Sequence, residues 1–111
     1  MNTGVKTIVY PVKDLDRAKE TYAALLGAPH TDTPYYVGYR VGDQEIGLDP
    51  NGHAKGMTGP VSYWSVDDIR AVLEALAATG AVPGEPTDVG GGRLLATATD
   101  ADDNVIGLVQ G

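Results

Sequence analysis

The sequence predicts an α+β fold in which two strand-helix-hairpin units follow each other along a chain of 111 residues. The segment Val12–Leu15 matches Val66–Ile69 at an offset of 54 residues, and each precedes a run with apolar residues at helical spacing. The tripeptide Ile46–Leu48 recurs as Ile106–Leu108 at an offset of 60, so the second unit has gained six residues. Two copies are too few for a solenoid and indicate two halves that share one core.

The first unit opens with a strand and a helix. Residues 5–12, VKTIVYPV, are β-branched and aromatic, and their late proline indicates a strand that is near an edge or ends there. Asp14 is a good helix N-cap, and Gly27 with Pro29 beyond it marks the helix end. The apolar face predicted for this helix consists of Leu15, Ala18, Tyr22, Leu25 and Leu26.

Two strands follow, at residues 33–41 and 44–50, and the two residues between them suit a tight hairpin. Pairing them around this turn places Gly38 opposite Gly47 and Arg40 opposite Glu45, and the same alternation pairs Tyr36 with Asp49. These six residues share one face. The other face is apolar enough to be the core side under a helix; it carries Val37, Tyr39, Val41, Ile46 and Leu48.

The order restarts after a turn-rich linker. Residues 61–66, VSYWSV, predict a strand, and residues 67–80 a helix that Gly80 ends. Its core face comprises Ile69, Val72, Leu73 and Leu76. A short strand, a glycine-rich turn, a longer strand, the polar turn DADDN and a last strand complete the chain. We expect a single domain, 1–111, with module one at about 4–50, a linker at about 51–59 and module two at about 60–111.

Composition narrows the function. Apolar residues make up 42% of the chain, no apolar run approaches the ~20 residues of a membrane span, and no cysteine is present. The polar start of the chain lacks the apolar core of a signal peptide, so we expect a soluble, cytoplasmic protein. A formal charge of −7 would repel phosphate backbones and anionic membranes, so neither nucleic acid nor membrane is an expected partner.

The opening KTIVYPVKDLDRAKETYAALLG, the second opening VDDI and the closing TDADDNVIGLVQ resemble the vicinal oxygen chelate superfamily, also called the glyoxalase/bleomycin-resistance/dioxygenase superfamily. The resemblance covers essentially the whole chain. It implies two βαβββ modules whose curved mixed sheets enclose a small-molecule cavity, with the helices on the outer faces. It also implies a homodimer that binds a small organic ligand.

Metal-using members of that superfamily hold a divalent cation with four strand residues, usually histidines and glutamates. The resemblance assigns these positions to Thr7, Gly47, Val61 and Gly107, which cannot form such a site because glycine and valine have no side-chain donor. We therefore expect no metal and no other cofactor, and a roomier, more apolar cavity where glycine leaves space. The chain's two histidines, His30 and His53, are expected to face solvent.

One predicted cluster has acid-base potential. Tyr36, Arg40, Glu45 and Asp49 share a hairpin face, where a cross-strand ion pair is the favoured arrangement and a polar anchor for a ligand is a further role. Tyr36 and Tyr63 are the candidates for stacking on a ligand, whereas Trp64 should turn toward the helices. The predicted ligand-binding residues are Thr7, Val9, Tyr36, Arg40, Glu45, Gly47, Asp49, Val61, Tyr63 and Gly107.

Three functions remain open from the sequence. The first is a metal-free binding protein of the bleomycin-resistance type, which holds an organic molecule such as an aromatic antibiotic or metabolite without altering it. The second is a metal-independent isomerase, epimerase or lyase in which Tyr36, Asp49 or Glu45 moves protons. The third is a non-catalytic regulatory subunit that uses the fold to dimerise.

Overall fold

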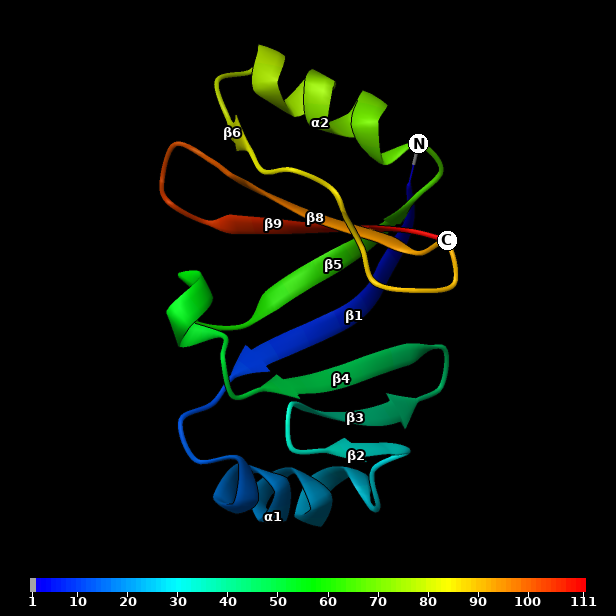
Figure 1. Cartoon of the computed structure of the whole chain (residues 1–111), viewed down its shortest axis with the longest axis vertical. Helices are drawn as coiled ribbons and strands as arrows, with labels where there is room; N and C mark the ends of the chain where they lie inside the picture. The colour runs from blue at the N-terminus through cyan, green and yellow to red at the C-terminus, as the bar shows by residue number, and fades with distance from the viewer. Residues whose placement is uncertain (1) are drawn as a thin grey trace. The chain divides into compact units, whose positions relative to one another are not determined.

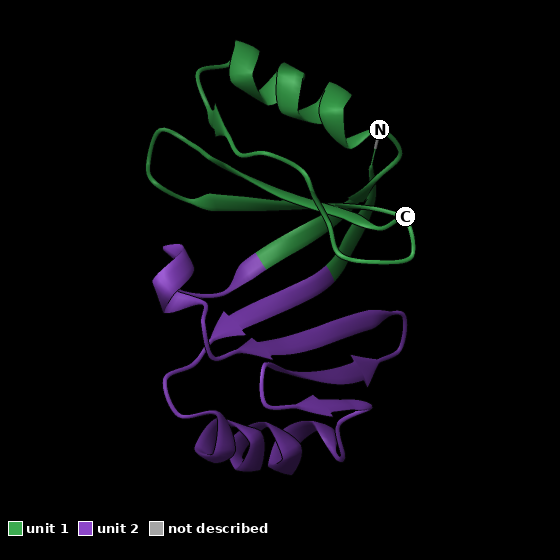
Figure 2. Ribbon diagram, in the orientation of Figure 1, with its two compact units in different colours: residues 1–6, 62–111 green, residues 7–61 purple. Residues whose placement is uncertain are grey.

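The computed structural model describes residues 2–111 and has the predicted α+β class, with two helices and a mixed sheet. The chain divides into two compact units (Figure 2): unit 1 comprises residues 1–6 and 62–111, and unit 2 comprises residues 7–61. The division runs through two strands, β1 (Asn2–Pro11) and β5 (Val61–Val66). The predicted module bounds stay a prediction.

Unit 2 contains the first helix and a small mixed sheet (Figure 1). Its strands follow the order β2-β3-β4-β1, in which β1 runs parallel to β4 and the other pairs are antiparallel. After β1, its elements are α1 (Leu15–Leu26), β2 (Thr31–Thr33), β3 (Tyr36–Val41), β4 (Gln44–Asp49) and the single-turn 3₁₀ helix η1 (His53–Lys55). The prediction missed β2 and η1.

The predicted hairpin register is confirmed. Gly38 pairs with Gly47 and Arg40 pairs with Glu45 between β3 and β4. The two-residue turn contains Gly42 at a φ of 58°, a left-handed conformation that glycine adopts without steric cost. The alternation of side chains along this hairpin therefore separates a core face from the face that carries the candidate site.

Helix α1 covers the core face of the hairpin, because Val37, Tyr39 and Leu48 are fully buried against it. Asp14 caps the helix by accepting a hydrogen bond from the backbone N–H of Arg17, as predicted. The helix residues in this cluster are Leu15, Ala18, Tyr22, Ala23 and Leu26. Leu25, predicted to be part of that face, is 77% exposed, because it lies at the margin of the apolar stripe.

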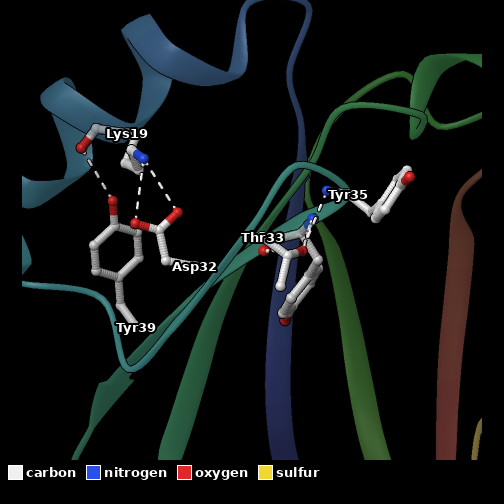
Figure 3. A network of polar contacts seen from close by, with 6 residues as sticks. Lys19, Asp32, Thr33, Tyr35 and Tyr39 are labelled. Carbon is white, nitrogen blue, oxygen red and sulfur yellow. Dashed lines mark hydrogen bonds and ion pairs between the residues drawn. The ribbon is translucent and has the colours of Figure 1, made fainter.

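Polar contacts fix α1 to β2 and β3 (Figure 3). The Tyr39 hydroxyl donates to the carbonyl of Lys19 at 3.0 Å, and the Lys19 ammonium binds both carboxylate oxygens of Asp32 at 3.1 and 3.2 Å. The hydrogen bond with Asp32 raises the pKa of Lys19, and burial raises the pKa of Tyr39. Tyr39 thus anchors the helix by its ring and its hydroxyl together.

Unit 1 repeats the helix-on-sheet arrangement. After β5, its elements are α2 (Ile69–Ala78), β6 (Val82–Pro83), β7 (Thr87–Asp88), β8 (Leu94–Thr99) and β9 (Val105–Gln110). The strand order is β5-β9-β8-β6, with β7 also paired to β8, and β5 is parallel to β9. Asp68 caps α2, and the predicted core face of α2 packs on β8 and β9.

Two smaller findings complete the fold. Trp64 is in register with Leu108, which packs in the core beneath α2, yet Trp64 is 39% exposed rather than buried there. Within residues 2–111, neither α1 nor α2 is long and apolar enough to cross a membrane.

Candidate functional site

A tyrosine ring covers Gly47 on the face of the unit 2 hairpin that is turned away from α1. A Cβ built on Gly47 would meet the Tyr36 hydroxyl and would lie 2.6 Å from ring atoms Cε1 and Cζ. Because Gly38 is directly opposite Gly47, Tyr36 is the diagonal cross-strand neighbour of this glycine, within reach of a long side chain. The phenol therefore occupies the place where a side chain at position 47 would begin.

The turn before β3 holds the Tyr36 backbone. The Thr33 hydroxyl oxygen accepts hydrogen bonds from the N–H groups of Tyr35 and Tyr36 and donates to the carbonyl of Tyr36 (Figure 3). Threonine hydroxyls stabilise turns in this way. Tyr35 is 75% exposed, so two adjacent tyrosines have different surroundings.

Four side chains form a polar cluster beside the Tyr36 ring: His30, Tyr36, Arg40 and Glu45. The Tyr36 hydroxyl donates to Glu45 Oε2 at 2.6 Å, and His30 Nε2 lies 3.0 Å from Glu45 Oε1. Arg40 Nη2 lies 3.3 Å from the same His30 nitrogen, and His30 Nδ1 is 2.7 Å from the hydroxyl of Thr31. A phenol, a carboxylate, an imidazole and a guanidinium thus converge on one strand face.

The cluster corrects one prediction and extends another. The favoured Arg40–Glu45 ion pair is wrong: among the described residues, the basic side chain within ion-pair distance of Glu45 is His30, although Arg40 is directly opposite Glu45 in register. His30 is exposed as predicted, but its side chain, 30% exposed, also contacts Glu45, Arg40 and Thr31, which the prediction did not include. The backbone N–H of His30 bonds to the carbonyl of Gly38, which brings the ring over the hairpin.

Asp49 has a separate role at the end of β4. Its side chain, 12% exposed, accepts hydrogen bonds from the backbone N–H of Asn51 and from the ammonium of Lys55, both at 2.8 Å. Its carboxylate therefore fixes the turn that leads into η1, which makes it a supporting residue rather than a proton donor or acceptor for a ligand.

The remaining predicted site residues are divided between the units. On β1, Thr7 pairs with Glu45 and Val9 with Gly47, and both side chains are buried. Val61, the last residue of unit 2, is also buried. Tyr63 and Gly107 pair with each other in unit 1.

The expectation of open space at the two glycines is wrong. A Cβ on Gly107 would lie 2.7 Å from Tyr63 ring atoms Cγ and Cδ2 and 2.8 Å from the carbonyl oxygen of Ser62. Each glycine therefore accommodates a tyrosine ring: Tyr36 comes from the neighbouring strand β3, and Tyr63 from β5. We call these the two tyrosine-glycine pairs.

The residues at the superfamily's four metal-ligand positions do not fit a metal. Thr7 offers a lone neutral hydroxyl, Val61 offers no donor, and at Gly47 and Gly107 tyrosine rings fill the space that a ligating side chain would need. Within residues 2–111, no group of three or more histidine, aspartate or glutamate side chains is arranged to hold a metal ion. The absence of a metal in the working protein stays a prediction.

A groove of about 300 Å³ lies in unit 1 between α2 and residues 83–86. It is lined by Arg70, Leu73, Glu74, Ala77, Pro83, Gly84, Glu85 and Pro86. None of these is a predicted site residue. Its wall is mostly surface side chains, so the polar cluster remains the stronger candidate site.

Sequence reasoning named His30 without placing it in the site and missed Thr31, because β2, which begins at Thr31 directly after His30, is only three residues long. A signal was available in the segment PHTDTP, where β-branched threonines lie between two prolines directly before the Tyr36 strand. It also missed the contact of Tyr36 with Gly47, which is diagonal, because the predicted register was applied only to residues directly opposite each other.

The chain belongs to the Glyoxalase/Bleomycin resistance protein/Dioxygenase superfamily, whose family model matches residues 4–108. This membership agrees with the two βαβββ modules that the sequence predicts. A comparison with curated proteins found no match.

Solved structures with the same fold include two epimerases. A Streptomyces coelicolor methylmalonyl-CoA epimerase variant, in complex with 2-nitronate-propionyl-CoA, is 17% identical with a TM-score of 0.77, over 100% of this chain and 96% of that one. The Mycobacterium tuberculosis methylmalonyl-CoA epimerase is 20% identical with a TM-score of 0.75, over 98% and 88%. A superfamily member from Vibrio splendidus 12B01 is 14% identical with a TM-score of 0.72, over 95% and 97%. At these identities the likeness shows the fold alone.

Proposed function

We propose that this protein binds a small, flat organic molecule on the polar cluster without a metal and without altering the molecule. The observation that carries the proposal is the position of Tyr36, whose ring covers Gly47 while its hydroxyl is held by Glu45. A fixed aromatic ring offers a stacking surface, and the exposed Arg40 beside it offers a polar contact that orients a ligand. Thr7 and Val9 form the adjoining buried floor on β1.

Binding by the cluster is tested in two stages. A thermal-shift screen with aromatic antibiotics, thiol-dicarbonyl adducts and divalent metals should find organic compounds that raise the melting temperature, since a ligand specific for the native state stabilises it. Calorimetry then compares Tyr36→Ala with Tyr35→Ala, a matched loss of an adjacent, exposed tyrosine. Only Tyr36→Ala should weaken binding, by about tenfold for a lost stacking contact of ~1.4 kcal/mol. Equal affinity in the two variants would count against the site.

A second candidate function is metal-independent acid-base catalysis. It is favoured by the continuous chain from the Tyr36 phenol through the Glu45 carboxylate to the His30 imidazole, with links of 2.6 and 3.0 Å. Such a chain can pass a proton to or from a bound molecule. Mass spectrometry of a bound compound recovered from D₂O distinguishes the two functions: an unchanged mass supports binding alone, whereas deuterium incorporation that Tyr36→Phe abolishes supports catalysis.

We propose further that the protein works as a homodimer, on the strength of its membership of this superfamily. Equilibrium sedimentation should give a mass of two chains, and a monomer over the working concentration range would reject the proposal. If the protein dimerises but no compound in the screen raises its melting temperature, the non-catalytic regulatory subunit becomes the better interpretation.

A further inference from the structure

The contacts of the polar cluster leave Arg40 without a carboxylate partner among the described residues. Glu45 has both carboxylate oxygens engaged, one by the Tyr36 hydroxyl and the other by His30. Arg40, by contrast, has no carboxylate within ion-pair distance among the described residues, and its contact in the cluster is with a nitrogen of His30. The guanidinium is also on the exposed part of β3, so a ligand can reach it.

His30 Nε2 faces two incompatible partners. Glu45 Oε1, at 3.0 Å, needs a hydrogen on this nitrogen, whereas Arg40 Nη2, at 3.3 Å, needs a lone pair there. A histidine ring nitrogen provides one or the other, never both. Either protonation state of this nitrogen therefore leaves one neighbour unsatisfied, and the bond of His30 Nδ1 with Thr31 does not remove the conflict.

We propose that the cluster takes the anionic group of a carboxylate-bearing aromatic ligand, which binds Arg40 while His30 takes up a proton. This inference rests on the proposed function, since it names the class of molecule that the same site binds. A ligand carboxylate replaces His30 as the partner of Arg40. The imidazolium then donates from Nε2 to Glu45 and from Nδ1 to the Thr31 hydroxyl, so every group has a partner.

Charge balance gives the direction of the proton linkage. With a neutral His30, Arg40 and Glu45 cancel, and an added anion leaves the cluster negative. With a protonated His30, the same anion leaves it neutral, so anion binding and proton binding favour each other. Lys19 and Asp32 do not enter this balance, because they pair with each other at 3.1 Å. A cationic ligand would bind Glu45 instead and release a proton.

Three probes of one shape test the inference: 2-naphthoate, 2-naphthylmethanol and 2-naphthylmethylamine. Calorimetry should show naphthoate binding about tenfold more tightly than the alcohol, because a charge-assisted bond to Arg40 is worth at least ~1.4 kcal/mol. Arg40→Gln should remove this advantage. Arg70→Gln, at an exposed position of α2 in the other unit, is the matched control and should retain the advantage.

The proton is counted by repeating the naphthoate titration in buffers of different ionisation enthalpy. Naphthoate affinity should rise as the pH falls from 7.5 to 5.5, with uptake of up to one proton per site. His30→Gln should abolish both the rise and the uptake.

The possible outcomes separate the inference from the proposed function. Tighter binding of the amine, proton release, or an unchanged naphthoate advantage in Arg40→Gln would overturn the anion site. Equal binding of naphthoate and the alcohol, lost in Tyr36→Ala, would overturn it while the proposed function stands. If none of the three probes binds, both the anion site and the proposed binding of flat aromatic molecules are wrong.

Discussion

Adding one methyl group at Gly47 should destabilise the protein only because Tyr36 is present. The Cβ of Gly47→Ala would overlap the Tyr36 hydroxyl and lie 2.6 Å from two ring atoms, so the ring must move. Moving it breaks the bond to Glu45, and hydrogen bonds to charged groups contribute about 1.5–3 kcal/mol. The lower end applies because the Glu45 side chain is 24% exposed. Alanine in place of glycine returns about 0.5–1 kcal/mol, which leaves a net loss of about 0.5–1 kcal/mol.

A double-mutant cycle measured by urea unfolding checks this reasoning. In the Tyr36→Ala background the obstacle is gone, and Gly47→Ala should stabilise by about 0.5–1 kcal/mol. The sign of the glycine substitution should therefore reverse between backgrounds, with a coupling energy of about 1.5 kcal/mol. Equal effects in both backgrounds would refute the claim that the ring occupies this position.

The second tyrosine-glycine pair provides the matched control. A Cβ on Gly107 would meet the Tyr63 ring but also the Ser62 carbonyl oxygen at 2.8 Å, and backbone cannot rotate away as a side chain can. Gly107→Ala should therefore cost about 1–3 kcal/mol, the range for overpacking. Unlike Gly47→Ala, it should remain destabilising when Tyr63 is replaced by alanine. Full rescue by Tyr63→Ala would show that the backbone contact is unimportant.

Three further predictions concern stability. Leu73→Ala should lower the free energy of unfolding by about 2–5 kcal/mol, because Leu73 is buried on the core face of α2. Leu25→Ala should lower it by less than about 0.5 kcal/mol, because Leu25 is 77% exposed on α1, and comparable losses would contradict the assigned helix faces. Hydrogen bonds from the side chain and backbone of Asn104 lower the pKa of Asp100, so this carboxylate stabilises the fold above its unfolded pKa and loses that contribution as pH falls through its folded pKa. Asn104→Ala should therefore reduce the loss in the free energy of unfolding as the pH is lowered into the acid range. An unchanged dependence on pH would contradict the role assigned to Asn104 in stabilising the Asp100 carboxylate. Asp49→Asn should lower the free energy of unfolding by about 1–3 kcal/mol in urea, because it weakens the hydrogen bonds that the buried carboxylate accepts from Asn51 and Lys55. No change in stability would contradict the structural role of Asp49.

The secondary structure could be predicted to the extent that periodicity was strong. The Asp14 cap, the hairpin register around Gly42 and the limits of β5 all follow from local signals. The short strand β2 could not be found in this way, because three residues give no measurable alternation.

The candidate site was less predictable for a physical reason. Alternation correctly placed Tyr36, Arg40 and Glu45 on one face, but which groups pair depends on side-chain reach and on neighbours brought in by the fold. Arg40 is directly opposite Glu45 in the register, yet it is His30 that contacts the Glu45 carboxylate. A missing side chain at Gly47 was equally compatible with a void or with a ring from a neighbouring strand, and only the structure distinguishes these.

The tyrosine-glycine pairs also restrict how this protein can change in evolution. A glutamate cannot replace either glycine alone, because the tyrosine that covers it would first have to move or be replaced. The two tyrosines come from different strands, β3 and β5, so each position needs its own change, and at Gly107 the Ser62 carbonyl oxygen would have to shift as well. A lineage that starts from this sequence would have to pass through paired substitutions, in a set order, before acidic side chains occupied both positions.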